Sequence, residues 1–147
     1  MGRTIALATL VAGTLDILFA AILSLINGRE PAAMLRSVAS GPFPGASDWG
    51  ATGSALGLLT HFVLMAIMAA VFVLAARARQ MLIEQPIKWG VIYGFVTYVV
   101  MNLIVLPLRF GVPLPPKPIS IATQLFAHIV LVGIPIALIA ARRLRSR

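Results

Sequence analysis

The sequence predicts an all-α integral membrane protein, in which four transmembrane helices form a bundle within a single domain, residues 1–147. Hydrophobic residues make up 60% of the chain and charged residues only 11%, whereas a soluble domain is roughly a quarter charged. A small globule leaves much of its surface exposed and cannot hide such an excess. Four apolar stretches also reach the roughly 20 residues that a helix needs to cross a bilayer. They lie at about 4–26, 51–76, 87–106 and 119–141.

Each stretch has a clear end. The first ends at Asn27-Gly28, and its apolar run exceeds the roughly 7–15 residues of a signal-peptide core, so we expect a retained helix. The second stops at Arg77, and the third at Pro107, which cannot donate the next helical hydrogen bond. The fourth stops in the arginine run that begins at Arg142.

The basic residues predict an orientation. Eight of the twelve Lys and Arg residues lie in the N-terminus, the second loop and the C-terminus, and four lie in the first and third loops. Because positive residues favour the cytoplasm, we expect both termini to face inward. The net charge of +8 therefore reflects helix flanks in a bilayer, and nucleic acid is not an expected partner. The absence of cysteine excludes disulfides and thiol catalysis.

The outer loops are rich in proline. Pro31 can open a short helix, since its missing N–H would be unpaired at that position anyway, and Gly41 would end it. We expect this helix to lie in the outer interface. The third loop, residues 108–118, contains four prolines and predicts a stiff polyproline-type connector.

One strongly polar residue stands out in each predicted helix. Such side chains are rare in a bilayer and usually face the interior of the bundle. Counted from the helix ends, all four lie near the midplane or slightly to its outer side, so they are expected to meet in one layer. They are Asp16, His61, Asn102 and His128.

The faces that carry these residues also carry small ones. Residues spaced by four share one side of a helix, and small residues at that spacing let helices pack closely in lipid. Tyr98 lies on the face of Asn102, and Gln124 lies on the face of His128, so both are candidates to support the layer. The glycines expected at helix packing contacts are Gly53, Gly57, Gly90 and Gly94.

Two interpretations of the polar layer remain open. Interhelical hydrogen bonds contribute roughly 0.6–2 kcal/mol in membranes, so the layer can be purely structural. Alternatively it is a proton or ion site, because histidine changes charge near neutral pH and a neighbouring carboxylate favours its protonation. Asp16 must be protonated or paired within the bilayer, and His61 or His128 is its natural partner.

Cofactors and catalysis are weaker alternatives. His61 and His128 could ligate a haem b from both sides, and Asp16 with both histidines could bind a divalent transition metal. A tightly packed, glycine-lined bundle offers no obvious slot for a porphyrin, and only one carboxylate lies in a helix, so we expect no cofactor. Motifs for hydrolysis or phosphate binding are absent, and we do not expect an enzyme.

The residues therefore suggest a small transport-type or proton-responsive membrane protein. An accessory or structural subunit of a larger membrane complex is the main alternative, and a bis-histidine haem b electron carrier is another. Besides the lipid bilayer, the expected partners are further copies of the chain or that larger complex.

Short motifs along the chain support a resemblance. They are Gly57-Leu-Leu-Thr-His61, Lys88-Trp-Gly90, Gly94, Asn102, Leu106-Pro107-Leu108, Val112-Pro-Leu-Pro-Pro116 and His128. With these the chain resembles the YagU-like family of bacterial inner-membrane proteins, and related short membrane proteins look similar at Gly13-Thr-Leu-Asp16 and Val132-Gly-Ile-Pro-Ile136. The resemblance covers about two-thirds of the chain. It implies a multi-pass, four-helix protein of the bacterial inner membrane, and the family's association with acid tolerance agrees with an Asp/His site.

Overall fold

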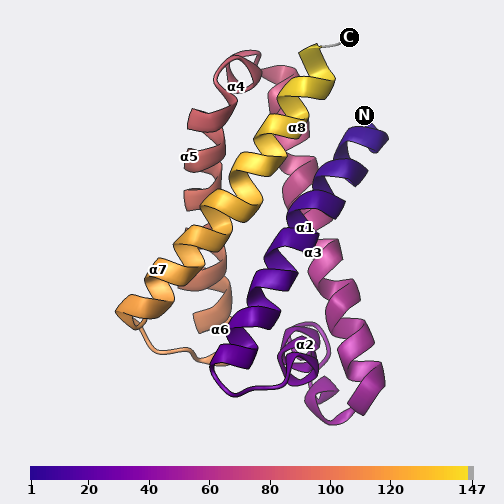
Figure 1. Ribbon diagram of the computed structural model, residues 1–147, viewed down its shortest axis with the longest axis vertical. Coiled ribbons are helices and arrows are strands. Elements are labelled where there is room, and N and C mark those ends of the chain that lie inside the picture. Colours follow the sequence, from indigo (N-terminus) through magenta and orange to yellow (C-terminus); the bar gives the residue numbers. More distant parts are fainter. Residues whose placement is uncertain (146–147) are drawn as a thin grey trace.

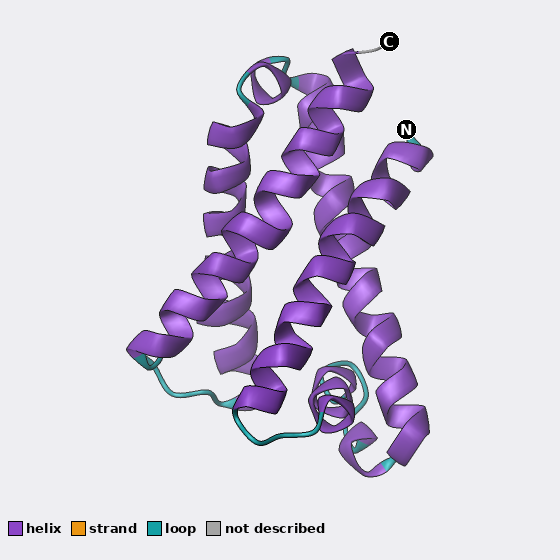
Figure 2. Cartoon of the chain, in the orientation of Figure 1, coloured by secondary structure: helices purple, strands orange, loops and turns teal. Residues whose placement is uncertain are grey.

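The computed structural model describes residues 1–145, and within that range it contains helices, turns and loops but no strand (Figure 1, Figure 2). Four of its helices are long and apolar enough to cross a membrane, which confirms the predicted number of spans and indicates a multi-pass membrane protein. Their observed ends lie within a few residues of the predicted ones. The spans are Gly2–Ile26, Gly50–Ala78, Pro86–Phe110 and Pro118–Arg145.

The first two spans are single α-helices, whereas the last two each contain a π-helical segment. The first span is α1, Gly2–Ile26, and the second is α3, Gly50–Ala78. The third consists of α5, Pro86–Tyr98, the π-helical η2, Val99–Val105, and α6, Leu106–Phe110. The fourth consists of α7, Pro118–Phe126, the π-helical η3, Ala127–Gly133, and α8, Ile134–Arg145.

The two π-helical segments have the same relationship to a proline. Each ends two residues before one, at Pro107 and at Pro135. The residue just before each proline donates its N–H to the carbonyl five residues back, rather than four. Because proline has no N–H and its ring clashes with the carbonyl four residues earlier, a regular α-helix would be broken there. A local π-type adjustment lets a membrane helix continue past the proline.

The third span therefore does not end where the sequence predicted. The expectation that it stops at Pro107 is wrong, since α6 continues to Phe110 and Gly111 ends it with a left-handed backbone conformation, φ 63°. Glycine adopts this conformation without steric cost and commonly ends helices in this way. The connector that follows is correspondingly shorter than expected, residues 111–117.

The helices pack most closely at the end where both termini lie (Figure 1). There α8 contacts α1, α3 and α5, so it occupies the middle of the bundle. Fully buried alanines, among them Ala8, Ala69 and Ala140, let the helices approach one another, and Phe72 and Ile136 fill the remaining space.

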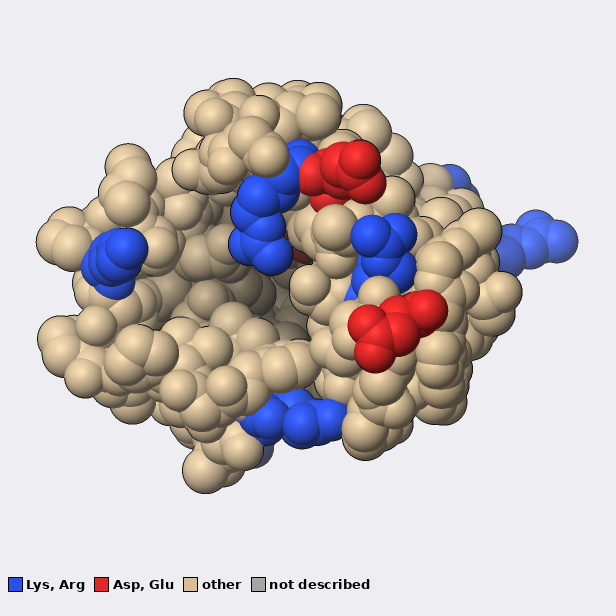
Figure 3. Space-filling view, turned by 90° about the horizontal axis from the view of Figure 1, so that it is seen from below, with Lys and Arg blue, Asp and Glu red and all other residues tan. Residues whose placement is uncertain are grey.

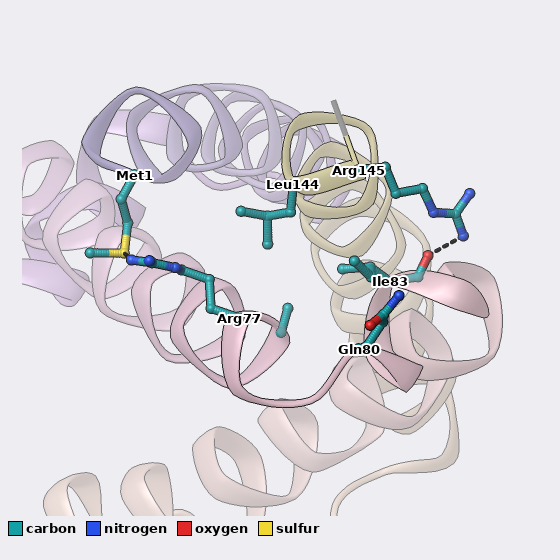
Figure 4. Close-up of a pocket in the computed structure, with 7 residues that line it drawn as sticks. Met1, Arg77, Gln80, Ile83, Leu144 and Arg145 are labelled. Atoms are coloured by element: carbon teal, nitrogen blue, oxygen red, sulfur yellow. Dashed lines mark hydrogen bonds between the residues drawn. The ribbon is translucent and has the colours of Figure 1, made fainter. Parts of the chain in front are cut away.

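Polar contacts also join the chain at this end. The hydroxyl of Tyr93 on α5 donates to the carbonyl oxygen of Met68 on α3 at 2.7 Å. A cavity of about 460 Å³ lies between the chain ends and the second loop, and Figure 4 shows the Arg77 side chain reaching the sulfur of Met1 beside it. Arg145 donates to the carbonyl oxygens of Ile83 and Glu84, which ties the end of α8 to the second loop. A short helix that the sequence did not predict, α4, Met81–Glu84, forms that loop.

The first loop folds back onto the bundle. Its helix, α2, Pro31–Ala39, begins at the predicted proline and crosses the long helices steeply, so that it is seen nearly end-on in Figure 1. α2 ends before Gly41, and a 3₁₀ turn, η1, Ala46–Asp48, leads into α3. α2 packs against the first half of α3 and also contacts α1.

Candidate functional site

Glycine brings α5 and η3 into backbone contact. A Cβ atom added to Gly94 would lie 2.5 Å from the Cα atom of Ile129 and would overlap the carbonyl oxygen of His128. A Cβ atom on Gly90 would lie 2.8 Å from the Cα atom of Ile134. Only a residue without a side chain permits this approach, as the predicted packing role of these glycines requires. The contact places the polar residues of the third and fourth spans within reach of one another.

His128 joins these two spans by hydrogen bonds from both ring nitrogens. Its Nε2 atom lies 3.2 Å from the Nδ2 atom of Asn102, and its Nδ1 atom lies 3.2 Å from the Oγ1 atom of Thr97. The hydroxyl of Thr97 in turn donates to the carbonyl oxygen of Gly94 at 2.9 Å. All three polar side chains are buried.

The direction of each hydrogen bond in this network follows from which groups can donate and which can only accept. A carbonyl only accepts, so the Thr97 hydroxyl gives its one proton to Gly94 and accepts from the Nδ1–H of His128. The Nε2 atom of a neutral His128 then carries a lone pair, which accepts from the amide N–H of Asn102. Every ring nitrogen is satisfied with the histidine neutral, the state that a buried site in a bilayer favours.

His61 forms a separate pair with Asp16, between α1 and α3. Its Nε2 atom lies 2.9 Å from the carbonyl oxygen of Gly13, and its Nδ1 atom lies 3.8 Å from the Oδ2 atom of Asp16. The side chain of His61 is 9% exposed and that of Asp16 is 20% exposed, so the carboxyl group is the more accessible member. A Cβ atom added to Gly13 would lie 2.7 Å from the Phe62 ring, so glycine at this position permits the close approach of α1 to α3.

This geometry determines how many protons the pair holds when it is neutral. Because a carbonyl accepts, Nε2 of His61 must carry a proton toward Gly13, and Nδ1 is left to face the carboxyl group. With no proton between Nδ1 and Oδ2, two lone pairs would face each other and the pair would carry a net negative charge. One shared proton makes the pair neutral, either as imidazolium and carboxylate or as imidazole and carboxylic acid. The geometry therefore brings a carboxyl group and an imidazole nitrogen 3.8 Å apart between two membrane-spanning helices.

The four predicted residues therefore form two pairs. The structure brings Asp16 to His61 and Asn102 to His128, and no hydrogen bond or ion pair joins the two pairs within residues 1–145. The reason is geometric: the first pair lies between α1 and α3, and the second lies between the third and fourth spans. The predicted buried layer is present, since His61, Asn102 and His128 are all buried. Its division into two pairs was not predicted, because depth along a helix can be counted from its ends whereas rotation about the helix axis cannot.

The two residues predicted to support the polar layer, Tyr98 and Gln124, differ in their burial and contacts. Tyr98 is buried, and its ring meets the ring of His128 edge-on with 6.1 Å between centroids. Gln124 is half-buried, and its side chain makes no hydrogen bond within the described part of the chain.

Gly53 and Gly57 lie against the folded first loop. A Cβ atom on Gly57 would overlap the backbone of Leu35 in α2, and one on Gly53 would overlap the carbonyl oxygen of Ala46 in η1. Their face of α3 is therefore packed by the folded first loop instead of another membrane-spanning helix. The pattern of small residues indicates a close approach but does not name the element that makes it.

The placement of the histidines bears on metal and haem binding. Both ring nitrogens of His128 are engaged within the protein, and His61 uses Nε2 for Gly13 and faces Asp16 with Nδ1. Among residues 1–145, no group of three or more His, Asp or Glu side chains is arranged to hold a metal ion. Haem or metal ligation by these histidines would thus require their present contacts to break.

Two residues of the second pair's surroundings were not predicted. Thr97 lies three residues after Gly94, on the same side of the helix, and a hydroxyl at that spacing was the available signal. Gly133 contacts the backbone of Gly90 and Gly94, and its spacing of four from Ala137 is the same small-residue pattern that indicated the other glycines.

Comparison of the chain with protein-family models, with curated proteins and with solved structures gave no match.

Proposed function

We propose that the protein is a proton-responsive, transport-type protein of the bacterial inner membrane, with both termini in the cytoplasm, and that the Asp16–His61 pair is its proton site. The observation that carries the proposal is the arrangement of His61, with Nε2 committed to Gly13 and Nδ1 facing Asp16 at 3.8 Å. A neutral pair holds one proton between two membrane-spanning helices. Asp and His side chains inside membrane helices commonly mark proton or ion paths.

The position of the Asp16–His61 pair also supports a change in helix packing when the pair loses its proton. Both contacts of His61 reach α1 from α3, so loss of the shared proton places a net negative charge between these helices. A charge in a bilayer is stabilised by water or by a counter-charge, and either requires the helices to move apart or to rotate.

The test is proton flux into liposomes. The full chain is reconstituted into vesicles that contain a pH-sensitive dye, and the dye signal is followed after a step in external pH. The wild type is expected to conduct protons above protein-free vesicles, and Asp16→Asn and His61→Gln to reduce that flux at least tenfold. Asp48→Asn is the matched control, because Asp48 is an exposed loop carboxylate away from the pair.

Two results would count against the proposal. Wild-type protein that conducts no more than empty vesicles excludes proton conduction by the isolated chain, and flux that survives Asp16→Asn excludes the pair as its path. If conduction is absent and a protein partner copurifies in mild detergent, the role of an accessory subunit in a larger membrane complex is favoured instead.

A further inference from the structure

A large groove opens at the end of the bundle opposite the termini. It has a volume of about 960 Å³ and lies between α2, the first half of α3, and the η2–α6 part of the third span. Figure 3 looks at the molecule from this end and shows the hollow with basic side chains on different sides of it. The volume is at the upper end of the roughly 300–1,000 Å³ typical of small-molecule sites.

The walls of the groove are apolar and are held apart by the fold. Val38 of α2, Val63 of α3 and Met101 of η2 contribute side chains to three different walls. α2 is seated on α3 by the backbone contact at Gly57, so the groove cannot close by a shift of α2 toward α3. At this end α3 and η2 face each other across the groove, and α2 forms its third wall.

Within a membrane, hydrocarbon is the material that best complements such a space. An empty apolar cavity forfeits the dispersion contacts of the atoms that line it, and lipid tails are as apolar as the side chains. The groove is open at its outer end, so an acyl chain can enter without displacing protein. An acyl chain is therefore the part of a ligand that fits the walls.

Two arginines at the groove add a charge requirement. Arg29 and Arg109 line it, and no acidic side chain does. Arg109 donates from Nε to the carbonyl oxygen of Gly41 at 2.7 Å and from Nη2 to that of Ser40 at 2.8 Å, which fixes the guanidinium at this position. Its remaining N–H groups stay open, and Arg29 makes no side-chain hydrogen bond within the described residues. Two arginines beside an apolar slot, with no carboxylate among the lining residues to offset them, favour a lipid whose headgroup carries a net negative charge.

We infer that this groove is a binding site for an anionic phospholipid, with one acyl chain along the apolar walls and the phosphate headgroup held by Arg29 and Arg109. Basic pockets between membrane helices bind anionic headgroups by the same chemistry. The inference is independent of the Asp16–His61 pair.

The experiment compares two lipids that differ in headgroup charge. The full-length protein is purified in mild detergent and stripped of lipid, and binding of phosphatidylglycerol and of phosphatidylcholine with identical acyl chains is measured by native mass spectrometry. Phosphatidylglycerol is expected to bind at least fivefold more tightly, about the effect of one arginine near an anionic headgroup. Arg29→Gln should reduce this preference toward unity. Arg3→Gln should retain it, because Arg3 lies in the first turn of α1, at the end of the bundle opposite the groove.

A steric variant tests the walls separately. Val63→Trp is expected to weaken binding of both lipids, because the indole fills the groove. Val71→Trp is its control: Val71 lies on the same helix and is 53% exposed, against 49% for Val63, but it does not line the groove. Equal affinity of the wild type for both lipids would overturn the proposal. So would an unchanged preference in Arg29→Gln, which removes a side chain that no residue of the described chain depends on.

Discussion

Asn102 and His128 lie in different membrane-spanning helices, each inside a π-helical segment, and the Nδ2 atom of Asn102 is 3.2 Å from the Nε2 atom of His128. Both segments end two residues before a proline. The same local adjustment thus shapes the backbone on both sides of the contact. π-helical turns occur frequently at functional sites, where they re-aim side chains that a regular helix would direct elsewhere.

Asn102 and His128 are expected to be energetically coupled. In a double-mutant cycle, Asn102→Ala and His128→Ala should each destabilise the protein, and together by less than their sum, with a coupling of about 0.6–1.7 kcal/mol. The free energy of unfolding in mixed micelles provides the measurement. Strictly additive effects would mean that the two side chains do not bond in the membrane-like state.

Thr97 is expected to be needed for its hydroxyl rather than its shape. Thr97→Val keeps the volume but leaves the Nδ1–H of His128 without an acceptor, which should cost about 1–3 kcal/mol of stability. Thr97→Ser should restore most of this. The control is Thr123→Val, because the hydroxyl of Thr123 bonds only to carbonyls of its own helix. Equal losses for Thr97→Val and Thr123→Val would contradict the network.

The close approach of α5 to η3 predicts that Gly94 tolerates no side chain. Gly94→Ala places a methyl group 2.5 Å from the Cα atom of Ile129, so the helices must separate, at a cost of about 1–3 kcal/mol or more. Gly2→Ala is the control, because nothing lies within 4 Å of a Cβ atom at that position. Thermal unfolding in detergent should show a lower midpoint for Gly94→Ala alone.

Removing one member of the Asp16–His61 pair should be worse than removing both. His61→Leu leaves the carboxyl group without its partner, and an unpaired Asp inside a membrane helix costs about 2.5–3.5 kcal/mol on insertion scales. Adding Asp16→Leu removes that carboxyl group and should recover stability. A double variant that is less stable than His61→Leu, by the same unfolding assay, would show that the two side chains act independently.

The predicted orientation can be tested with single cysteines, since the chain has none of its own. Ser47→Cys lies in the first loop and Gln80→Cys in the second, and both positions are exposed. With the termini in the cytoplasm, a membrane-impermeant maleimide added to intact cells should label Ser47→Cys, and label Gln80→Cys only after permeabilisation. The reverse pattern would place the termini outside.

Much of the fold could be predicted because its causes are local. A run of apolar residues long enough to cross hydrocarbon must be helical, since only a helix satisfies its own backbone hydrogen bonds there. That rule placed four spans between their flanking Gly, Pro and Arg residues, and Pro31 likewise indicated where α2 begins. It failed at Pro107, because passage through a proline depends on how the turn before it adjusts.

The sequence by itself determined which residues are polar in an apolar setting, and it therefore named Asp16, His61, Asn102 and His128. Only the tertiary structure decided that they form two pairs, and that α2 covers Gly53 and Gly57. Pairing depends on the rotation of each helix about its axis. The π-helical turns change this rotation, and close contacts between glycines and the backbone of a neighbouring helix fix it. A hydrophobicity pattern sets the length and depth of a helix in the bilayer, whereas its rotation is set by the neighbours it packs against.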